Sequence, residues 1–361
     1  MNRERTFRNL LVTGGAGFIG TNFIRYLFGR PEFSGRVINL DKLTYAGNPA
    51  NLVDIRTEHG DRYHLERADI CDADAVRSIF ERYEIDAVVH FAAESHVDRS
   101  ILGPREFVNT NVMGTFTLLE AARAAWKERR DVLFHHVSTD EVYGSLGAEG
   151  FFIETTPYTP RSPYSASKAA SDHLVRAYHH TYGLPITLSN CSNNYGPYQF
   201  PEKLIPLMIL NMLEGESLPI YGEGKNVRDW LYVEDHASAI WAIMTRAGAG
   251  ETYNVGGETE RRNIDLVHRL CEIVAEETGR PASAYTALIR FVADRPGHDQ
   301  RYAIDCSKLK RDLGWSQAHR FDEGLRHTVR WYLEHHDWVE SVRTGDYRKW
   351  IEANYTAPGR T

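Results

Sequence analysis

Short apolar runs alternate with stretches of helical periodicity through the first half of the chain. Short apolar runs at residues 10–12 and 36–40 are strand candidates, and further strand-like segments lie at residues 62–65, 86–91, 132–137 and 185–189. Between them, apolar residues recur at helical spacing over residues 18–28, 73–83 and 107–126. This alternation is typical of βαβ units, in which parallel strands form a sheet with helices on both faces. We therefore predict an α/β fold with a doubly wound parallel sheet of the Rossmann type.

The pattern changes after about residue 195. Prolines interrupt it at positions 197, 201, 206 and 219, and glycines cluster at 222–224 and 256–257. Helical segments are predicted over residues 234–245, 264–277 and 321–333. We predict a Rossmann-type domain over residues 1–195 and a smaller, mixed C-terminal lobe over residues 196–361 that closes a cleft. The boundary is soft, because the chain can cross between the lobes more than once.

The composition is that of an ordinary globular protein. Hydrophobic residues make up 42% and charged residues 25% of the 361 residues, which excludes a disordered or fibrous chain. The net charge of −7 argues against a general nucleic-acid binder, but it leaves room for a local basic pocket. We find neither a membrane span nor a signal-peptide core. We expect a cytoplasmic protein with no nucleic-acid or membrane partner.

Neither the cysteines nor the histidines predict a metal site. Cys71, Cys191, Cys271 and Cys306 lie far apart in the sequence, so we expect reduced thiols rather than a disulfide framework or a zinc site. The adjacent histidine pairs point in different directions on a strand or a helix, and no spacing of metal ligands emerges.

A glycine-rich turn follows the first predicted strand. Gly14, Gly17 and Gly20 are spaced three apart and open the first predicted helix. In a dinucleotide fingerprint, the first glycine permits the tight turn and the second lets the backbone approach a pyrophosphate. The third lets the helix pack close to the strand. Glycines alone often mark plain turns, but here a strand precedes them and a helix follows.

Asp41 stands at the end of the second predicted strand, where the fingerprint places an acidic residue. A carboxylate there accepts hydrogen bonds from the ribose hydroxyls and repels a 2′-phosphate. The sequence therefore favours NAD over NADP. Asp69 follows the third strand, and it either meets the adenine or caps the helix over residues 73–83.

Tyr164 and Lys168 are four residues apart, so on a helix they share one face. A phenol ionises near pH ~10, and both a neighbouring ammonium group and a positively charged nicotinamide lower that pKa. The phenolate can then take a proton from a sugar hydroxyl. The same spacing also occurs on exposed helix faces. A catalytic pair is favoured here because the spacing follows the glycine turn at the distance seen in two-lobed reductases.

Residues 138–144, with the sequence STDEVYG, follow the strand predicted over residues 132–137. They therefore lie at the carboxyl end of a parallel strand, where α/β sheets place their ligands. Thr139 can orient a substrate hydroxyl. Asp140 and Glu141 can serve as one acid and one base if their surroundings differ. The alternative is a solvent-exposed loop in which the two carboxylates only accept capping hydrogen bonds.

Together, these motifs closely resemble those of the dTDP-glucose 4,6-dehydratases, extended members of the short-chain dehydrogenase/reductase superfamily. The resemblance covers nearly the whole chain. It also includes AAESHVDRS at 92–100, NCSNNYGPYQFPEKLIPL at 190–207, VRDWLYVEDH at 227–236 and DRPGHDQRY at 294–302. The glycine turn and YSASK would also fit epimerases and decarboxylases of the superfamily. The Asp-Glu pair together with DRPGHD is more specific to the dehydratases.

The resemblance implies a reaction and a role for each catalytic residue. Sugar oxidation at C4 by NAD makes the C5 proton acidic, and water leaves across C5 and C6. The hydride then returns to C6, and C5 is reprotonated. Tyr164 would take the proton of the 4-hydroxyl, and Lys168 would bind the nicotinamide ribose. Asp140 would protonate the departing 6-hydroxyl, and Glu141 would remove the C5 proton. The product would be a 4-keto-6-deoxy sugar nucleotide, and NAD would stay bound because it is regenerated.

The resemblance also implies two sets of binding residues. For NAD, besides the three glycines, Tyr164 and Lys168, they are Phe18, Ile19, Asp41, Lys42, Leu43, Thr44, Asp69, Ile70, Phe91, Ala92, Ala93, Ser95, Thr110 and Asn194. For the nucleotide sugar they are Ser95, Thr139, Asn193, Lys203, Leu204, Pro219, Ile220, Tyr221, Arg228, Asn263, Asp294, Arg295, Pro296, Gly297 and His298.

Three other functions stay open at this point. A UDP-glucose 4,6-dehydratase would share the same catalytic set, and the sequence does not decide between thymine and uracil. A UDP-sugar epimerase or decarboxylase is disfavoured, because epimerisation needs no acid at C6. A non-catalytic NAD-sensing module would need the glycine turn but not the four acid–base residues.

We also expect a homodimer. The helices predicted over residues 104–126 and 163–182 carry wide apolar stripes, and the resembling family pairs such helices into a four-helix interface. The alternative is that these stripes face only the sheet.

Overall fold

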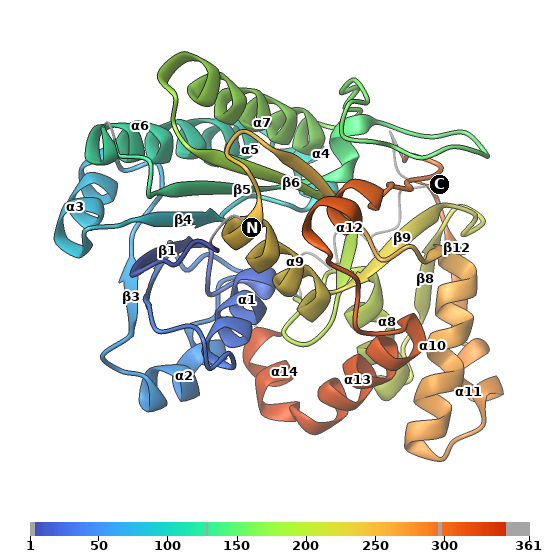
Figure 1. Ribbon diagram of the computed structural model, residues 1–361. Coiled ribbons are helices and arrows are strands. Elements are labelled where there is room, and N and C mark those ends of the chain that lie inside the picture. The colour runs from blue at the N-terminus through green and yellow to red at the C-terminus, as the bar shows by residue number, and fades with distance from the viewer. Residues whose placement is uncertain (1–3, 128, 295–297, 344–361) are drawn as a thin grey trace.

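The computed structural model describes residues 4–127, 129–294 and 298–343, and its centre is a seven-stranded parallel sheet. The strand order is β10-β6-β5-β4-β1-β2-β3 (Figure 1). These strands are β1 (Asn9–Thr13), β2 (Arg36–Asp41), β3 (Tyr63–Arg67), β4 (Ala87–His90), β5 (Leu133–Thr139), β6 (Ile186–Cys191) and β10 (Thr252–Val255). The doubly wound parallel sheet predicted from the sequence is confirmed.

Helices cover both faces of this sheet, as Figure 1 shows for α6 and α7 against α1 and α9. One face packs on α3 (Ala73–Tyr83), α6 (Thr115–Trp126) and α7 (Pro163–Tyr182). The other packs on α1 (Phe18–Phe28), α2 (Val53–Glu58) and α9 (Val233–Arg246). Within β1, Leu11 faces the first set, while Leu10 and Val12 face the second. Burial on both sides explains the continuous apolar run of β1.

The six predicted strands are β1 to β6, but the helix predicted over residues 107–126 is not one regular helix. It consists of α5 (Pro104–Phe107), a π-helical segment η2 (Val108–Gly114) and then α6. Within η2, Asn111 turns its side chain inward: its Oδ1 accepts the Glu94 amide at 2.9 Å, and its Nδ2 donates to Ser167 at 2.8 Å. This widened segment lies next to the predicted catalytic helix, α7.

The chain returns to the large sheet after it has entered the second lobe. β10 pairs in parallel with β6, and α9 packs on the same side as α1. The division at residue 195 stays a prediction, but this crossing is of the kind that made the boundary soft.

The smaller lobe contains two short sheets and a helical core. One sheet has the order β11-β9-β7 and the other β12-β8. Its strands are β7 (Asn193–Tyr195), β8 (Leu218–Tyr221), β9 (Val227–Tyr232), β11 (Glu260–Arg262) and β12 (Ile289–Val292). Its helices are α8 (Leu204–Glu214), α10 (Asn263–Thr278), α11 (Ala282–Thr286), α13 (Phe321–Glu334) and α14 (His336–Val342), whereas α12 (Ser307–Leu313) packs on β10 and α9. The predicted helical segments correspond to α9, α10 and α13.

Three short helical segments follow strands of the large sheet: η1 (Pro49–Leu52) after β2, α4 (Val97–Leu102) after β4 and η3 (Asp140–Tyr143) after β5. Among the helices of the described residues, none combines the length and apolar character needed to cross a membrane.

The contact between α1 and β1 yields a stability prediction. A Cβ at Gly20 would lie 2.3 Å from the carbonyl oxygen of Gly14, and backbone cannot yield as a flexible side chain does. We expect Gly20→Ala to lower the free energy of unfolding by about 1–3 kcal/mol, as overpacking does elsewhere. Guanidinium unfolding measures this loss.

The matched control is Gly29→Ala, at the other end of α1. A Cβ there would lie 3.4 Å from the Arg25 carbonyl oxygen, at a helical φ of −74°. Its unfolding midpoint should stay close to that of the parent protein. Equal midpoints for the two variants would show that the close approach at Gly20 is not a constraint.

Candidate active site

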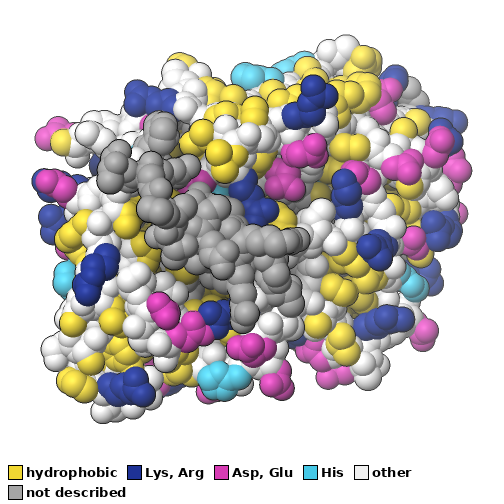
Figure 2. All heavy atoms as spheres, turned by 180° about the vertical axis from the view of Figure 1, so that it is seen from behind, with side chains coloured by type: hydrophobic (Ala, Val, Ile, Leu, Met, Phe, Trp, Pro, Cys, Tyr) yellow, Lys and Arg dark blue, Asp and Glu magenta, His cyan; other side chains and the backbone are white. Residues whose placement is uncertain are grey.

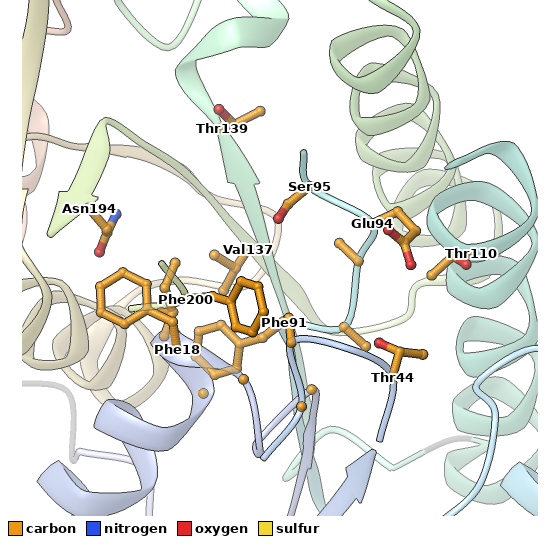
Figure 3. Close-up of a pocket in the computed structure, with 18 of the residues that line it drawn as sticks. Phe18, Thr44, Phe91, Glu94, Ser95, Thr110, Val137, Thr139, Asn194 and Phe200 are labelled. Carbon is orange, nitrogen blue, oxygen red and sulfur yellow. The ribbon is translucent and has the colours of Figure 1, made fainter. Parts of the chain in front are cut away.

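A cavity of about 450 Å³ opens at the carboxyl ends of β1, β2, β4, β5 and β6. This is the edge at which open α/β sheets bind their ligands. The side chains labelled in Figure 3 come from α1, β5, η2 and the loops that follow β2 and β4, with Asn194 and Phe200 added from the chain after β6. Segments far apart in the sequence therefore share one cavity.

The glycine turn has the geometry that the fingerprint requires. Gly14 has φ +71°, and a Cβ there would lie 2.8 Å from the backbone nitrogen of Ala92. Gly17 is the N-cap of α1 and brings no side chain to the helix end. The open N–H groups of that end suit a diphosphate. Both glycines line the cavity, as does Gly20.

Asp41 is buried at the end of β2, and its carboxylate organises the loop around it. Its Oδ2 accepts the Ala16 amide at 3.0 Å and its Oδ1 accepts the Leu43 amide at 2.8 Å. Burial raises the pKa of Asp41, while these two hydrogen bonds lower it. Two backbone donors thus support a carboxylate facing the cavity.

Asp69 also lines the cavity, and its Oδ2 lies 2.7 Å from the Nζ of Lys42. It does not cap the following helix. Asp72 is the N-cap of α3, and its side chain accepts the amides of Asp74 and Ala75. The capping alternative for Asp69 was wrong.

The start of α7 places Tyr164 and Lys168 in the cavity. Ser162 caps the helix by accepting the Ser165 amide at 3.1 Å, and Pro163 occupies the first turn. Both Tyr164 and Lys168 are buried and line the cavity, which rules out an exposed helix face. The Nζ of Lys168 donates to the carbonyl oxygen of Val137 at 2.8 Å.

Burial governs the pKa of Tyr164 in the structure. It raises the pKa well above the ordinary value, and the negative charge of Glu141 raises it further, while a hydrogen bond with Thr139 lowers it. The lowering expected from Lys168 together with a bound nicotinamide cation concerns the site with its cofactor, and it stays a prediction. Burial also lowers the pKa of Lys168.

Thr139, Asp140 and Glu141 form the end of β5 and the start of η3. Thr139 is the N-cap, and its Oγ1 lies 3.3 Å from both the Glu141 amide and the Asp140 Oδ1. Thr139 and Glu141 line the cavity, and Asp140 lies buried behind them, 2% exposed. This burial rules out the solvent-exposed loop.

Asp140 has the surroundings of a protonated acid. Burial raises its pKa well above the ordinary value, and repulsion from Glu141 and Asp229 adds to the rise. Arg228 acts in the opposite direction. Within the described residues, the Oδ2 of Asp140 has no hydrogen-bond partner. The two adjacent carboxyl groups therefore sit in different environments, as division into an acid and a base requires.

The structure brings the predicted cofactor residues together almost completely. Of that set, Leu43 alone does not line the cavity, and it contributes its amide to Asp41. The remaining members, Phe18, Ile19, Lys42, Thr44, Ile70, Phe91, Ala92, Ala93, Ser95, Thr110 and Asn194 among them, all line it.

The predicted substrate residues are more dispersed. Four line the cavity: Ser95, Thr139, Asn193 and Lys203. The others described do not line it: Leu204, Pro219, Ile220, Tyr221, Arg228, Asn263, Asp294 and His298. Arg295, Pro296 and Gly297 lie outside the described residues.

Three of the predicted substrate residues show a link to the site or, within the described chain, an unpaired buried atom. Tyr221 donates from its hydroxyl to the Asp98 Oδ2 at 3.1 Å, which connects the smaller lobe to α4. The buried Oδ1 atoms of Asn193 and Asn263 have no hydrogen-bond partner in the described part of the chain. Buried amide oxygens normally do have one.

Several cavity residues were not predicted. They are Leu40, Tyr45, Ala46, Gly47, Glu106, Val137, Ser138, Cys191, Ser192, Gln199, Phe200 and Glu202. Five of them fall inside the motif at residues 190–207, so its full length was a usable signal. The described residues contain no group of three or more His, Cys, Asp or Glu side chains placed to hold a metal ion.

Comparison with known proteins agrees with this geometry. The profile of the GDP-mannose 4,6 dehydratase family matches residues 11–328. The dTDP-glucose 4,6-dehydratase of Shigella flexneri is 55% identical over 360 residues, which cover 96% of this chain and 98% of the relative. The chain belongs to the dTDP-glucose 4,6-dehydratase family.

Solved structures of a dehydratase and of an epimerase both resemble this chain. The dTDP-glucose 4,6-dehydratase DesIV of Streptomyces venezuelae, solved with NAD bound, has a TM-score of 0.85 at 47% identity. It covers 93% of this chain and 100% of its own. A UDP-glucose 4-epimerase of Thermus thermophilus reaches a TM-score of 0.80 at 30% identity, covering 91% and 99%. The fold is thus common to dehydratases and epimerases.

The environment of Asp140 yields a prediction with a definite sign. Because its pKa is raised in the folded protein, Asp140 is neutral at low pH, and folding stability falls as pH rises and the carboxyl must ionise. Asp140→Asn cannot ionise, so it should be more stable than the parent at pH 8, with a smaller difference at pH 5. Each unit of pKa difference corresponds to about 1.4 kcal/mol. Urea unfolding across this range measures the gap.

Asp172 is the matched control with the opposite sign. It is also fully buried, but its pKa is lowered against the effect of burial, first by His136 and then by Lys168 and by the hydrogen bond that Ser138 donates to its Oδ2. Asp172→Asn should therefore be less stable than the parent at neutral pH. A pH-independent difference for Asp140→Asn would contradict the protonated-acid assignment.

Proposed function

We propose that this protein converts dTDP-glucose to dTDP-4-keto-6-deoxyglucose and water, with NAD as a tightly held cofactor. The observation that carries the proposal is one cavity lined by the glycine turn, by Tyr164 and Lys168, and by Thr139 and Glu141, with the buried Asp140 directly behind. This is a dinucleotide site joined to an acid–base set.

The residues of the cavity fit NAD. The bare N-terminus of α1 suits a diphosphate, and the Asp41 carboxylate suits a ribose diol and disfavours a 2′-phosphate. Lys168 reaches the carboxyl end of β5 and would hold the nicotinamide ribose. When bound, NAD supplies the oxidation at C4 and the later reduction at C6.

Tyr164 is assigned the first proton transfer, from the 4-hydroxyl of the sugar. Its phenolate is disfavoured by burial and by Glu141, so cationic groups near the oxygen must offset these effects. Lys168, one helical turn away, carries the one positive charge among the residues placed in the catalytic set. Thr139, whose hydroxyl is next to the carboxyl pair, would orient the same sugar hydroxyl.

Glu141 and Asp140 are assigned the loss of water that follows. Once C4 is a ketone, the C5 proton is acidic, and Glu141 removes it from the cavity side. Asp140, kept protonated by its burial, gives its proton to the 6-hydroxyl as the C6–O bond breaks. Epimerisation would require no such acid. The nucleotide end of the substrate would extend past Asn193 and Lys203 toward the remaining predicted residues of the smaller lobe.

Two variants separate the halves of the reaction. Glu141→Gln keeps shape but loses the base, so it should still oxidise C4 while 6-deoxy product forms about 10²–10⁴-fold more slowly. Tyr164→Phe should block the oxidation itself. Single-turnover absorbance of the nicotinamide, together with exchange of the C5 proton in deuterated water, distinguishes the two outcomes.

A Glu141→Gln variant that exchanges C5 at the parental rate would show that Glu141 is not the base. A parent protein that yields no 4-keto sugar from dTDP-glucose, assayed beside UDP-glucose, would contradict the proposed function.

The carboxylate of Asp41 should decide the choice of dinucleotide. In Asp41→Asn an amide oxygen still accepts one backbone hydrogen bond, but the charge that repels a 2′-phosphate is gone. After equilibration with equal NAD and NADP, the bound ratio of NADP to NAD should rise about tenfold or more, because the repulsion between two close charges is about 1 kcal/mol in bulk water and about 4 kcal/mol near a protein surface. A bound ratio equal to that of the parent protein would refute this role.

We further propose a homodimer formed through the helices on the α6–α7 side. Large apolar side chains are exposed there: Ile101, Leu102, Val108, Met113, Phe116 and Tyr182. Figure 2 shows hydrophobic side chains gathered along the upper edge, where Figure 1 places α4 to α7. Such patches mark interaction surfaces, and most oligomers close with two-fold symmetry.

Light scattering should give the mass of two chains for the parent protein and of one chain for Phe116→Glu. Phe291→Glu is the matched control, because Phe291 is exposed on β12, away from this patch, and it should stay dimeric. A monomeric parent at micromolar concentration would remove the proposal.

The cytoplasm is the compartment we assign. All four cysteines are free thiols, and three of them are buried. Reduced thiols persist in compartments that keep disulfides from forming.

A further inference from the structure

Three side chains from three separate segments meet at the side of the cavity. Tyr45 comes from the loop after β2, Arg99 from α4, and Glu202 from the segment before α8. The Tyr45 hydroxyl donates to the Glu202 Oε1 at 3.2 Å, and the Arg99 Nη2 lies 3.4 Å from the Oε2. The Arg99 guanidinium also lies 3.7 Å from the centre of the Tyr45 ring. We call this group the Tyr45–Arg99–Glu202 clasp.

Glu202 is the buried member on which the clasp depends. It is 6% exposed, and burial raises its pKa, while Lys203 and Arg99 lower it. Burying an unpaired carboxylate costs free energy. This cost keeps Tyr45 and Arg99 in contact with Glu202. A second link runs beside it, since the Lys203 Nζ donates to the Ser95 carbonyl oxygen at 3.2 Å.

The clasp joins the walls of the cavity rather than lying behind them. Tyr45 and Glu202 both line the cavity. Their chain neighbours Thr44 and Phe200, and Ser95 from the loop that leads into α4, are among the side chains drawn in Figure 3. Tyr45 lies four residues from Asp41, so the clasp connects the loop assigned to the adenosine ribose with the smaller lobe.

None of the three side chains takes part in the assigned proton transfers, so the clasp needs another explanation. The proposed reaction oxidises and then reduces the same sugar, and NAD ends each cycle as it began. A cofactor that left between the two steps would strand a keto intermediate. Slow release of NAD therefore favours completion of the reaction, and rapid exchange of the cofactor is not required.

We propose that the Tyr45–Arg99–Glu202 clasp closes the cavity over NAD and sets the rate at which the cofactor leaves. This inference rests on the proposed function, because it takes NAD as the occupant. The three residues are positioning residues: they hold the two loops and the smaller lobe together, and release requires their contacts to open.

The variants follow from the contacts. Glu202→Gln keeps an oxygen to accept from Tyr45 but loses the charge that pairs with Arg99. Tyr45→Phe keeps the ring under Arg99 but loses the hydroxyl. Glu277→Gln is the matched control, because Glu277 pairs with Arg326 and Arg330 between α10 and α13, and none of the three lines the cavity.

The experiment follows the exchange of bound NAD. Each protein is purified with its NAD, mixed with excess isotope-labelled NAD, and desalted at intervals. Exchange should be about tenfold faster or more in Glu202→Gln, since a charge-assisted contact is lost. Tyr45→Phe should be faster by a smaller factor, and Glu277→Gln unchanged. Activity of Glu202→Gln should decay after dilution and return when NAD is added, whereas thermal unfolding stays near the parental midpoint.

Each result bears on a different claim. A parent protein that holds NAD and exchanges it as fast as Glu202→Gln would overturn the clasp and leave the proposed function standing. Faster exchange in Glu277→Gln as well would also overturn the clasp, because any weakened ion pair would then suffice. A parent that never carries NAD would contradict the proposed function itself, and the clasp with it.

Discussion

The active site depends on the close approach of α1 to β1. With no Cβ at Gly20, the first turn of α1 lies against the carbonyl of Gly14, and the helix end points over the edge of the sheet. This approach fixes where the bare amide groups of the helix lie relative to the ends of β2 and β4. Asp41 from β2 in turn receives the Ala16 amide from the glycine turn. The geometry of the dinucleotide site thus follows from a steric limit on one residue.

Around this frame, the catalytic groups share a region where charge is poorly solvated. Tyr164, Lys168 and Asp140 are all buried, and in each case burial is the first cause of the changed pKa. Each is thereby pushed toward its neutral form. A site of this kind responds strongly to any charge that enters it, because screening by water is weak. The charges of a bound cofactor and substrate therefore affect the protonation of these three groups.

How far the sequence could predict this molecule differs from part to part. Strands such as β1 and β4 were predictable because burial on both faces leaves short apolar runs. The glycine turn was predictable because its spacing follows from the tight turn and the close packing of the helix. β10 was not predicted because TYNV is only four residues long and follows a segment that belongs to the smaller lobe. The π-helical segment escaped because the inward turn of Asn111 depends on Glu94 and Ser167, which are distant in sequence. Cavity residues such as Cys191 and Phe200 have side chains that signal no chemistry on their own, and the desolvation of Tyr164 could not be predicted because burial is a tertiary property.

The position of β10 at the end of the large sheet has a consequence for synthesis. β6 is complete at residue 191, but the strand that covers its open edge ends only at residue 255. At roughly 5–20 residues per second on the ribosome, the nascent chain presents an apolar, unpaired strand edge for several seconds. During that interval it is open to pairing with another chain. The chain order therefore makes the C-terminal half a requirement for the solubility of the N-terminal half as it emerges.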